Sequence, residues 1–194
     1  MVKRLYLLRH GRVDTGGRYI GSTDLPLLQE GREDLAAVAP YLRRQNFDSV
    51  LCSPLLRCRQ SLDVLDLDVR SEICPELREI DFGAWEGLTF SEILQRDPLL
   101  VEKWAVWSEE FRFPGGEGIG AFLDRIKTIR RRVKTDPAKR ILIISHGGVI
   151  RQLVCSCLGI GSENYLAFDI QPGLCSVIDL HLQGGVLVGL NQGK

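Results

Sequence analysis

The N-terminal segment reads Leu5-Tyr6-Leu7-Leu8-Arg9-His10-Gly11. Its uninterrupted apolar run is typical of a strand buried on both faces, as the strands of parallel sheets are. The charged pair and the glycine that follow indicate where this strand ends. In open sheets with flanking helices, ligands bind beyond the carboxyl ends of the strands. The segment therefore predicts a buried parallel strand that delivers Arg9 and His10 to a functional edge.

Two further apolar runs have the same form, and helical segments lie between and after the strands. The runs are Val50-Leu51-Cys52 and Ile141-Leu142-Ile143-Ile144. Four helices are predicted. The first begins near Glu30, the second contains Cys58, Leu62 and Leu65, the third covers Ile119 to Val133, and the fourth covers Val149 to about Leu158. This alternation predicts an α/β fold: a three-layer sandwich with a mostly parallel central sheet flanked by helices. Pro40 is expected to kink or restart the first helix.

The remaining segments are a terminal hairpin and an irregular stretch. Residues 176–182 and 186–190, joined at Gly184-Gly185, are predicted to form the hairpin. Glycine and proline punctuate residues 78–117, which are predicted to hold only helical fragments. Because no repeat, low-complexity segment or linker divides the sequence, we expect a single domain over residues 1–194.

The charge balance excludes some classes of partner. The 194 residues carry 25 Lys plus Arg and 25 Asp plus Glu, so the formal net charge is zero. A neutral chain exerts no overall attraction on nucleic acid or on an anionic membrane surface. No stretch has the roughly 20 apolar residues of a membrane span. The predicted partner is a small molecule, without nucleic acid or membrane, and a homodimer is left open.

Cysteine usage points to a reducing compartment. The spacings of the six cysteines fit neither paired metal knuckles nor a dense disulfide framework. Several stand inside apolar runs, where a free thiol behaves as a small hydrophobe. The apolar run at the N-terminus is short and ends in charge, unlike a signal peptide. These features predict a cytoplasmic protein with buried, reduced thiols at Cys52, Cys58, Cys74, Cys155, Cys157 and Cys175.

The predicted strand ends collect two histidines and several arginines. His10 follows the first strand, His146 follows the strand at 141–144, and Arg57 opens the helix after the second strand. Guanidinium groups match phosphate oxygens in pairs, so this set suits a phosphoryl group. No carboxylate at these ends is spaced to complete a metal site. We therefore predict a phosphate pocket with no metal and no cofactor.

In such a pocket a neutral imidazole can attack phosphorus. Departure of the alkoxide then needs a proton, which a carboxylic acid can donate. The segment from residue 76 to residue 87 offers four carboxylates for this task, and the residues alone do not choose among them: Glu76, Glu79, Asp81 and Glu86.

Four motifs in order resemble those of the histidine phosphatase superfamily, also called phosphoglycerate mutase-like. They are Leu7-Leu8-Arg9-His10-Gly11, Ser53-Pro54-Leu55-Leu56-Arg57-Cys58-Arg59-Gln60-Ser61, Leu77-Arg78-Glu79, and Ser145-His146-Gly147-Gly148. One such triplet would be weak evidence, but four at the family's intervals are specific. The resemblance implies the family's fold and a phosphatase or mutase activity.

The resemblance also implies a role for each matched residue. His10 becomes phosphorylated and Glu79 is the proton donor. Arg9, Arg57 and His146 surround the phosphate. Three further residues, in or beside stretches shared with the family, are expected near the substrate: Ser22, Glu117 and Gly147.

The sequence departs from the family pattern beside the first motif. Val13 stands where relatives usually have Thr or Ser, and Gly16 where many have Asn. Leu28 replaces a frequent Thr, a change expected to weaken a helix N-cap. These departures put one pocket hydrogen bond and one substrate contact in doubt, while the implied catalytic set is complete.

The substrate follows from a finer resemblance. The chain has little room for the insertion that true mutases carry, which favours a phosphatase. The stretches 17–27 and 82–87 are most similar to those of α-ribazole phosphatases of cobalamin biosynthesis, which remove the 5′-phosphate of α-ribazole phosphate. A broad-specificity phosphatase or a mutase-like enzyme is the alternative. A non-enzymatic alternative is a module that binds a phosphate ligand without turnover. The basic residues from Arg125 to Lys134 are expected to form a solvated helix face.

Overall fold

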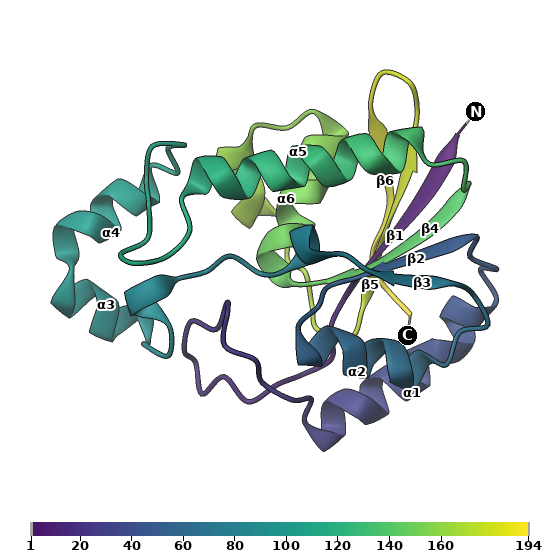
Figure 1. Ribbon diagram of the computed structural model, residues 1–194, viewed down its shortest axis with the longest axis horizontal. Helices are drawn as coiled ribbons and strands as arrows, with labels where there is room; N and C mark the ends of the chain where they lie inside the picture. The colour runs from purple at the N-terminus through teal and green to yellow at the C-terminus, as the bar shows by residue number, and fades with distance from the viewer. Residues whose placement is uncertain (1, 194) are drawn as a thin grey trace.

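The central element of the computed structural model, which describes residues 2–193, is a six-stranded sheet with helices on both faces (Figure 1). The strands are β1 (Lys3–Arg9), β2 (Ser49–Cys52), β3 (Ser71–Ile73), β4 (Arg140–Ser145), β5 (Cys175–Leu180) and β6 (Gly185–Gln192). Their order in the sheet is β3-β2-β4-β1-β5-β6. The first four are parallel to one another, and β5 is antiparallel to both β1 and β6. The predicted α/β sandwich with a mostly parallel sheet is confirmed.

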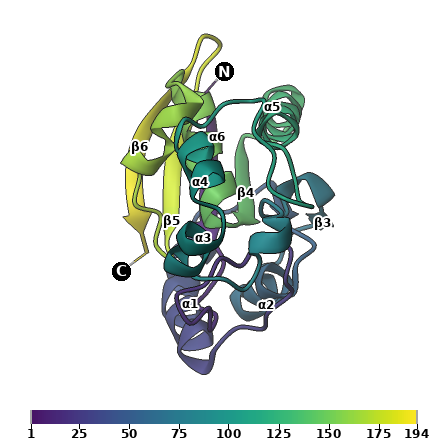
Figure 2. The same cartoon turned by 90° about the vertical axis from the view of Figure 1, so that its left-hand side faces the viewer.

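The helices form the two outer layers. They are α1 (Gln29–Arg43), α2 (Leu56–Leu65), α3 (Phe90–Arg96), α4 (Pro98–Ala105), α5 (Ile119–Thr135) and α6 (Gly147–Leu158). Helices α5 and α6 cover one face of the sheet, and α1 and α2 cover the other (Figure 1). The short helices α3 and α4 project past one end of the sheet (Figures 1 and 2). Among residues 2–193, no helix combines the length and the apolar character needed to cross a membrane.

Both faces of β1 are buried, which explains its lack of polar alternation. Leu5 and Leu7 belong to a cluster formed with α5 and α6, whereas Tyr6 and Leu8 belong to a second cluster formed with α1 and α2. The central strand β4 divides its side chains in the same way. Successive side chains of a strand point to opposite faces, so a strand between two helical layers must be apolar at every position.

Helix α1 tolerates two unfavourable residues at its ends. Leu28 occupies the N-cap and makes no side-chain hydrogen bond there, as expected from its departure from the family pattern. Pro40 lies in the last turn, where the helix continues without restarting. Proline removes a single N–H bond at this position, and burial of Leu35, Val38 and Leu42 holds the helix in place.

The structure differs from the sequence predictions at β3 and at Arg125. Strand β3 was not predicted, because its three residues are exposed and form no apolar run. The helical fragments predicted within residues 78–117 are the short helices α3 and α4, which pack around the fully buried Trp85. The expectation that the basic side of α5 faces solvent is wrong for Arg125, which is only 8% exposed. Arg125 follows Phe122 by one turn and therefore lies on the buried side, with its guanidinium 4.6 Å from the Phe122 ring centre.

The predicted buried, reduced cysteines are confirmed. All six thiols are free and buried. Burial disfavours the thiolate and raises the pKa of Cys52 to about 12, and those of Cys74 and Cys157 to about 11. These cysteines therefore act as apolar core residues.

Candidate active site

The parallel strands bring the predicted histidines and arginines to one edge. Strands β1 and β4 are neighbours with Arg9 opposite Ser145, so the next residues of each strand, His10 and His146, also lie side by side. Their ring centres are 5.1 Å apart. Arg57, at the start of α2, donates a hydrogen bond from Nε to His146 Nδ1 at 3.1 Å. The pairing of strands far apart in sequence thus assembles the cluster.

A backbone contact determines the tautomer of His10. Its Nδ1 lies 2.7 Å from the carbonyl oxygen of Gly11. A carbonyl oxygen only accepts hydrogen bonds, so Nδ1 must carry the proton. In the neutral ring, Nε2 then keeps its lone pair. His10 is therefore held in the form in which Nε2 can act as a nucleophile.

The surroundings of His10 keep it neutral. The side chain is buried, and Arg57 and Arg9 both act on it with positive charge. Burial is the larger cause, and together these effects lower the pKa of His10 to about 3 from its usual 6.5. The imidazole therefore stays unprotonated throughout the neutral and mildly acidic range.

This lowered pKa predicts a pH-dependent stability. Between pH 3 and pH 6.5 the unfolded chain binds a proton at His10 and the folded chain does not, so stability rises with pH. From pH 6.5 down to pH 5, His10 is expected to lower the free energy of unfolding by about 2 kcal/mol. Urea unfolding of the wild type and of His10→Gln at both pH values measures this share. Equal pH dependence in the two proteins would contradict it.

Arg57 is buried and still has donors available. It is 1% exposed. Beyond its bond to His146, it donates from its two terminal nitrogens to the carbonyls of Thr23 and Gly21, at 2.9 Å each. A guanidinium has five N–H groups, and these contacts use three. Two N–H groups remain, one on each terminal nitrogen, and a guanidinium can donate from its two terminal nitrogens to two oxygens of a phosphate.

His146 is fixed at both ring nitrogens. Nδ1 accepts from Arg57, so Nε2 carries the proton and donates it to Ser53 Oγ at 2.7 Å. Burial, followed by the charges of His10 and Arg57, keeps the pKa of His146 well below its usual range. The structure thus places the predicted phosphate ligand His146 beside Arg57, where it aligns the guanidinium. Ser53 belongs to the second motif, although sequence analysis gave it no role.

Arg9 extends the cluster toward a cavity. Its terminal nitrogen donates to the carbonyl of Ile170 at 2.7 Å. Gly147, the first residue of α6, lies so close that a side chain there would reach the Arg9 guanidinium at 3.4 Å. Burial lowers the pKa of Arg9, although a guanidinium with a normal value above 12 remains charged. Arg9 therefore brings a second cation to the edge where His10 lies.

Of the four candidate carboxylates, only Glu79 reaches this edge. Its carboxylate accepts hydrogen bonds from the backbone N–H of Gly148, in the first turn of α6, and of Ile80. The other three serve local structure: Glu76 is bonded to Cys74, Asp81 to Ser22 and Gly83, and Glu86 to the backbone of residues 21–23 and of Phe82. The geometry favours the candidate that the resemblance selected.

A cavity of about 390 Å³ opens beside these groups. Its catalytic end is formed by Arg9, Glu79, Gly147 and Gly148. The rest of the lining includes six aromatic residues together with Arg18 and Arg151. The aromatic members come from distant parts of the chain: Tyr19, Phe82, Trp104, Trp107, Phe122 and Tyr165. Tyr165 stacks on Trp107 with ring centres 4.1 Å apart. The volume suits a small organic ligand.

Sequence analysis missed this aromatic wall. A usable signal was the placing of all three tryptophans at positions 85, 104 and 107, inside the segment predicted as irregular. Aromatic residues concentrated in one loop-rich segment need a shared packing partner or a ligand. Tyr165 had no comparable signal, because it reaches the cavity from a 3₁₀ turn at Ser162–Ala167.

Two residues expected near the substrate do not line this cavity. The Ser22 hydroxyl donates to Asp81, and its backbone N–H donates to Glu86. Glu117 is buried in an ion pair with Arg125 at 2.8 Å. These contacts of Ser22 and Glu117 thus brace the loops around the site.

The two departures near the first motif have structural explanations. Val13 packs against the core cluster under α1 and α2. Gly16 adopts a positive φ of 55°, a conformation that asparagine also tolerates better than most residues. A change between Asn and Gly at this position therefore preserves the backbone of the loop.

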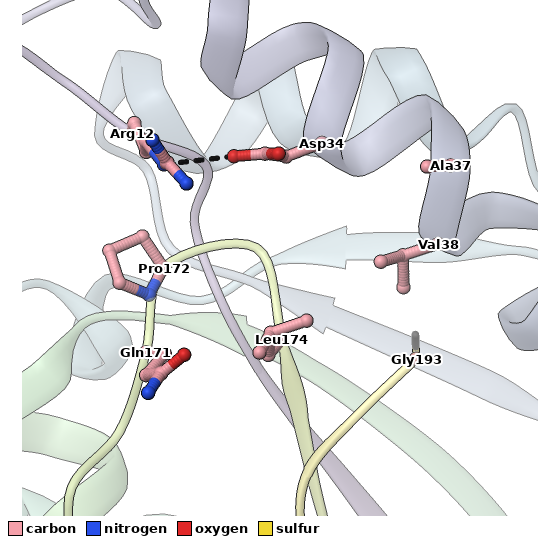
Figure 3. A pocket seen from close by; sticks show the side chains of 8 residues that line it. All are labelled: Arg12, Asp34, Ala37, Val38, Gln171, Pro172, Leu174 and Gly193. Atoms are coloured by element: carbon pink, nitrogen blue, oxygen red, sulfur yellow. Dashed lines mark ion pairs between the residues drawn. The ribbon is translucent and has the colours of Figure 1, made fainter.

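A second cavity, of about 490 Å³, lies between α1 and the loop that precedes β5 (Figure 3). Its arginine, Arg12, is already paired with Asp34 at 2.9 Å. Most of its lining is aliphatic or backbone: Ala37, Val38, Pro172, Leu174 and Gly193, together with Gln171. Arg9 and Glu79 line the first cavity and not this one, so we place the chemistry at the first.

Comparisons with known proteins agree with this geometry. The chain is 32% identical over 196 residues to an adenosylcobalamin/α-ribazole phosphatase of Escherichia coli K12, covering 97% of this chain and 95% of the relative. It is 28% identical to phosphoserine phosphatase 1 of Hydrogenobacter thermophilus, covering 98% and 92%. The structure of an α-ribazole phosphatase from Shigella flexneri matches with a TM-score of 0.87 at 31% identity, covering 97% and 96%.

The family assignment rests on nearly the whole chain. The sequence model of the histidine phosphatase superfamily, branch 1, matches residues 5–193. That range contains all four motifs and all the residues placed at the strand ends. The chain belongs to branch 1 of the histidine phosphatase superfamily, and it is a phosphomonoester hydrolase.

Proposed function

We propose that this phosphatase works through phosphorylation of His10 and that its substrate is an alkyl phosphate whose released alcohol bears a flat aromatic ring system, with α-ribazole 5′-phosphate as the main candidate. The observation that carries the mechanism is the tautomer of His10, whose Nδ1–H is held by Gly11 so that Nε2 presents a lone pair. This nitrogen lies in a cluster with two guanidinium groups, which suits attack on an anionic phosphate.

In the first step, Nε2 of His10 forms a bond to phosphorus while the bond from phosphorus to the ester oxygen breaks. The leaving oxygen takes a proton from the Glu79 carboxyl group. The proton on His10 Nδ1 stays bonded to the Gly11 carbonyl, which stabilises the positive charge that the ring acquires. The products of this step are the free alcohol, phosphorylated His10 and the Glu79 carboxylate.

In the second step, water attacks phosphorus and the bond between phosphorus and Nε2 breaks. Glu79 removes a proton from the water, which restores its acid form for the next cycle. Inorganic phosphate leaves, and His10 returns to the neutral tautomer. A single carboxyl group thus serves as acid and then as base, which its place beside Gly148 and Arg9 allows.

The charge that spreads over the phosphate oxygens in both steps needs donors that are already in place. Arg57 supplies two N–H groups that no residue in the range 2–193 occupies, and its orientation is set by His146, Thr23 and Gly21. Arg9 supplies a second guanidinium from the neighbouring strand end. These groups require no metal ion in the proposed steps.

The aromatic walls support the choice of leaving group. The cavity that Arg9 and Glu79 line is also lined by the aromatic rings of Trp107, Tyr165, Tyr19 and Phe82. α-Ribazole is a nucleoside with a flat bicyclic base, which can stack on such surfaces, whereas serine or glycerate cannot. Two of the similar proteins described above are named α-ribazole phosphatases, which agrees with this chemistry.

A panel of substrates tests the proposal. We expect the highest kcat/KM for α-ribazole 5′-phosphate, with lower values for phosphoserine, 3-phosphoglycerate and p-nitrophenyl phosphate. Inorganic phosphate should be released, with no isomerised phosphoglycerate. A higher kcat/KM for phosphoserine would instead assign the activity of the Hydrogenobacter relative. Comparable values for all four would indicate broad specificity, and binding without turnover would indicate a phosphate-binding module.

Tyr165→Ala tests the aromatic wall directly. The variant removes the Tyr165 ring, which stacks on Trp107 in the cavity wall. Loss of its contact with the substrate's base should raise KM for α-ribazole 5′-phosphate by roughly five- to tenfold, in line with the ~1 kcal/mol that an aromatic pair contributes. The kinetic constants for phosphoserine should stay within twofold. Phe90→Ala, on an exposed side chain of α3, is the matched control. Equal losses on both substrates would show that Tyr165 does not contact the leaving group.

A further inference from the structure

Arg125 is a buried arginine that the proposed steps do not use. It stands in the middle of α5, with a side chain that is 8% exposed. Its Nε and one terminal nitrogen donate to the two oxygens of Glu117, at 2.8 Å each. Glu117 is equally buried. The attraction between two buried charges is about offset by the free energy of removing them from water. The ion pair is therefore not explained by its own contribution to stability.

The remaining donors of Arg125 all go to one short piece of backbone. One terminal nitrogen donates to the carbonyls of Glu76 and Arg78, at 2.7 and 2.6 Å. The other donates to the carbonyl of Glu79 at 3.2 Å. With the two bonds to Glu117, all five N–H groups have a partner. Arg57 keeps two N–H groups for a ligand, whereas Arg125 keeps none, so Arg125 cannot bind phosphate as it stands.

The carbonyl of Leu77, which Arg125 does not contact, accepts a hydrogen bond from a different element. Ser145 Oγ, at the end of β4, donates to the carbonyl of Leu77 at 2.8 Å. Four consecutive carbonyls, from residue 76 to residue 79, are therefore bonded to side chains. This segment comprises the end of a 3₁₀ turn and the two residues after it, and it belongs to no strand. No β-sheet hydrogen bonds therefore hold its carbonyls in place. Ser145 immediately precedes His146, which ties the segment to the strand end that carries the phosphate site.

Glu117 holds Arg125 in the required orientation. Its two oxygens bind the guanidinium side by side, which fixes the plane of the group and directs its other edge at the three carbonyls. The backbone N–H of Glu117 also donates to the carbonyl of Asp81, two residues beyond Glu79. The stretch around Glu117, which resembles a substrate border in the family, thus contacts the acid segment from behind.

We propose that Arg125 is a positioning residue that locks the backbone of residues 76–79, so that the Glu79 carboxyl group stays within reach of the leaving oxygen. The inference rests on the proposed role of Glu79 as the proton donor. Arg125 touches neither substrate nor phosphate in this scheme. Its effect is confined to the proton transfer, and it reaches that step through three backbone carbonyls.

The choice of leaving group isolates this role. An alkyl phosphate such as glycerol 2-phosphate releases a poor leaving group that needs a proton. p-Nitrophenyl phosphate releases a stabilised phenolate that departs without one. Loss of acid positioning should therefore lower kcat/KM for the alkyl ester far more than for the aryl ester. General damage to the site or to the fold would lower both values alike.

Four variants are compared with Glu79→Gln, which defines the full loss of the acid. Arg125→Met with Glu117→Leu removes both buried charges together and so leaves no unpaired buried charge, since Arg78, which also contacts Glu117 at 3.5 Å, is exposed. Arg125→Lys keeps the ion pair but has too few donors for all three carbonyls. Glu117→Gln keeps Arg125 and loosens its orientation. Arg131→Met, on the exposed side of the same helix, is the matched control. Thermal unfolding of each protein confirms that it is folded at the assay temperature.

We expect the double variant to lose roughly 10- to 100-fold in kcat/KM for the alkyl ester and less than threefold for the aryl ester, since small misplacements of a reacting group have effects of this size. Arg125→Lys and Glu117→Gln should fall between it and the wild type. If Glu79→Gln shows the leaving-group difference and the folded Arg125 variants do not, the positioning role is wrong. If Glu79→Gln lowers kcat/KM for both esters alike, Glu79 is not the proton donor, and the positioning role of Arg125 is then wrong as well.

Discussion

Replacing His10 with alanine is expected to lower kcat/KM by roughly 10⁴- to 10⁶-fold, because the variant has no group that can accept the phosphoryl group. The wild type should also form a phosphorylated protein when it is mixed with substrate and quenched within milliseconds. This label should be stable in alkali and lost in acid, as a phosphorus–nitrogen bond is. The variant should show no such label at any time.

The chain contains a natural control for this experiment. His181 is an exposed histidine in the turn between β5 and β6. His181→Ala should keep both the turnover and the acid-labile label. If His10→Ala retained wild-type turnover, or if the label persisted in it, the nucleophile would have to be assigned elsewhere. Because His10 is buried beside Gly11 and His146, thermal unfolding of the variant must accompany the kinetics.

Arg57→Met is expected to have the second largest effect, a loss of roughly 10³- to 10⁵-fold in kcat/KM, comparable to removal of other arginines that stabilise a transferring phosphoryl group. Methionine keeps much of the apolar volume but removes both unused N–H groups. It also leaves His146 Nδ1 and the carbonyls of Gly21 and Thr23 without their donor. Steady-state kinetics and the dissociation constant of inorganic phosphate measure the two consequences.

Arg59→Met separates a local role from a general effect of charge. Arg59 lies two residues further along α2 and is exposed. It contributes the same formal charge, but residues two apart on a helix do not share a face. Its replacement should change kcat/KM by less than twofold. Similar losses in both variants would mean that α2 acts through its overall charge, and the proposed fork of Arg57 would be wrong.

The sheet could be predicted because both of its faces are covered. The runs at 5–8, 50–52 and 141–144 show no polar alternation, and this pattern has few explanations other than a central parallel strand. Once these strands were placed, the positions of His10, Arg57 and His146 at one edge followed from the geometry of parallel sheets. The family motifs then gave these positions their expected roles.

Other features depend on contacts that no local pattern records. Strand β3 is a three-residue edge strand with exposed side chains, and it exists only because β2 offers a free edge. Apart from the family resemblance, nothing in the sequence distinguished Glu79 from its three acidic neighbours; the structure does so through its contact with Gly148, 69 residues away. Arg125 looked like part of a solvated face because its buried partners, Glu117 and the carbonyls of residues 76–79, are brought to it by tertiary folding.

The division of β1 between two cores limits how this protein can evolve. Leu5 and Leu7 share their side of the sheet with Arg9, while Tyr6 and Leu8 face the other core. Inserting or deleting one residue within the strand would exchange the two sets of side chains and turn Arg9 away from the cavity. Length changes in the lineage should therefore be confined to the loops, and the spacing between the first apolar residue and His10 should be invariant even where the identities of the apolar residues drift.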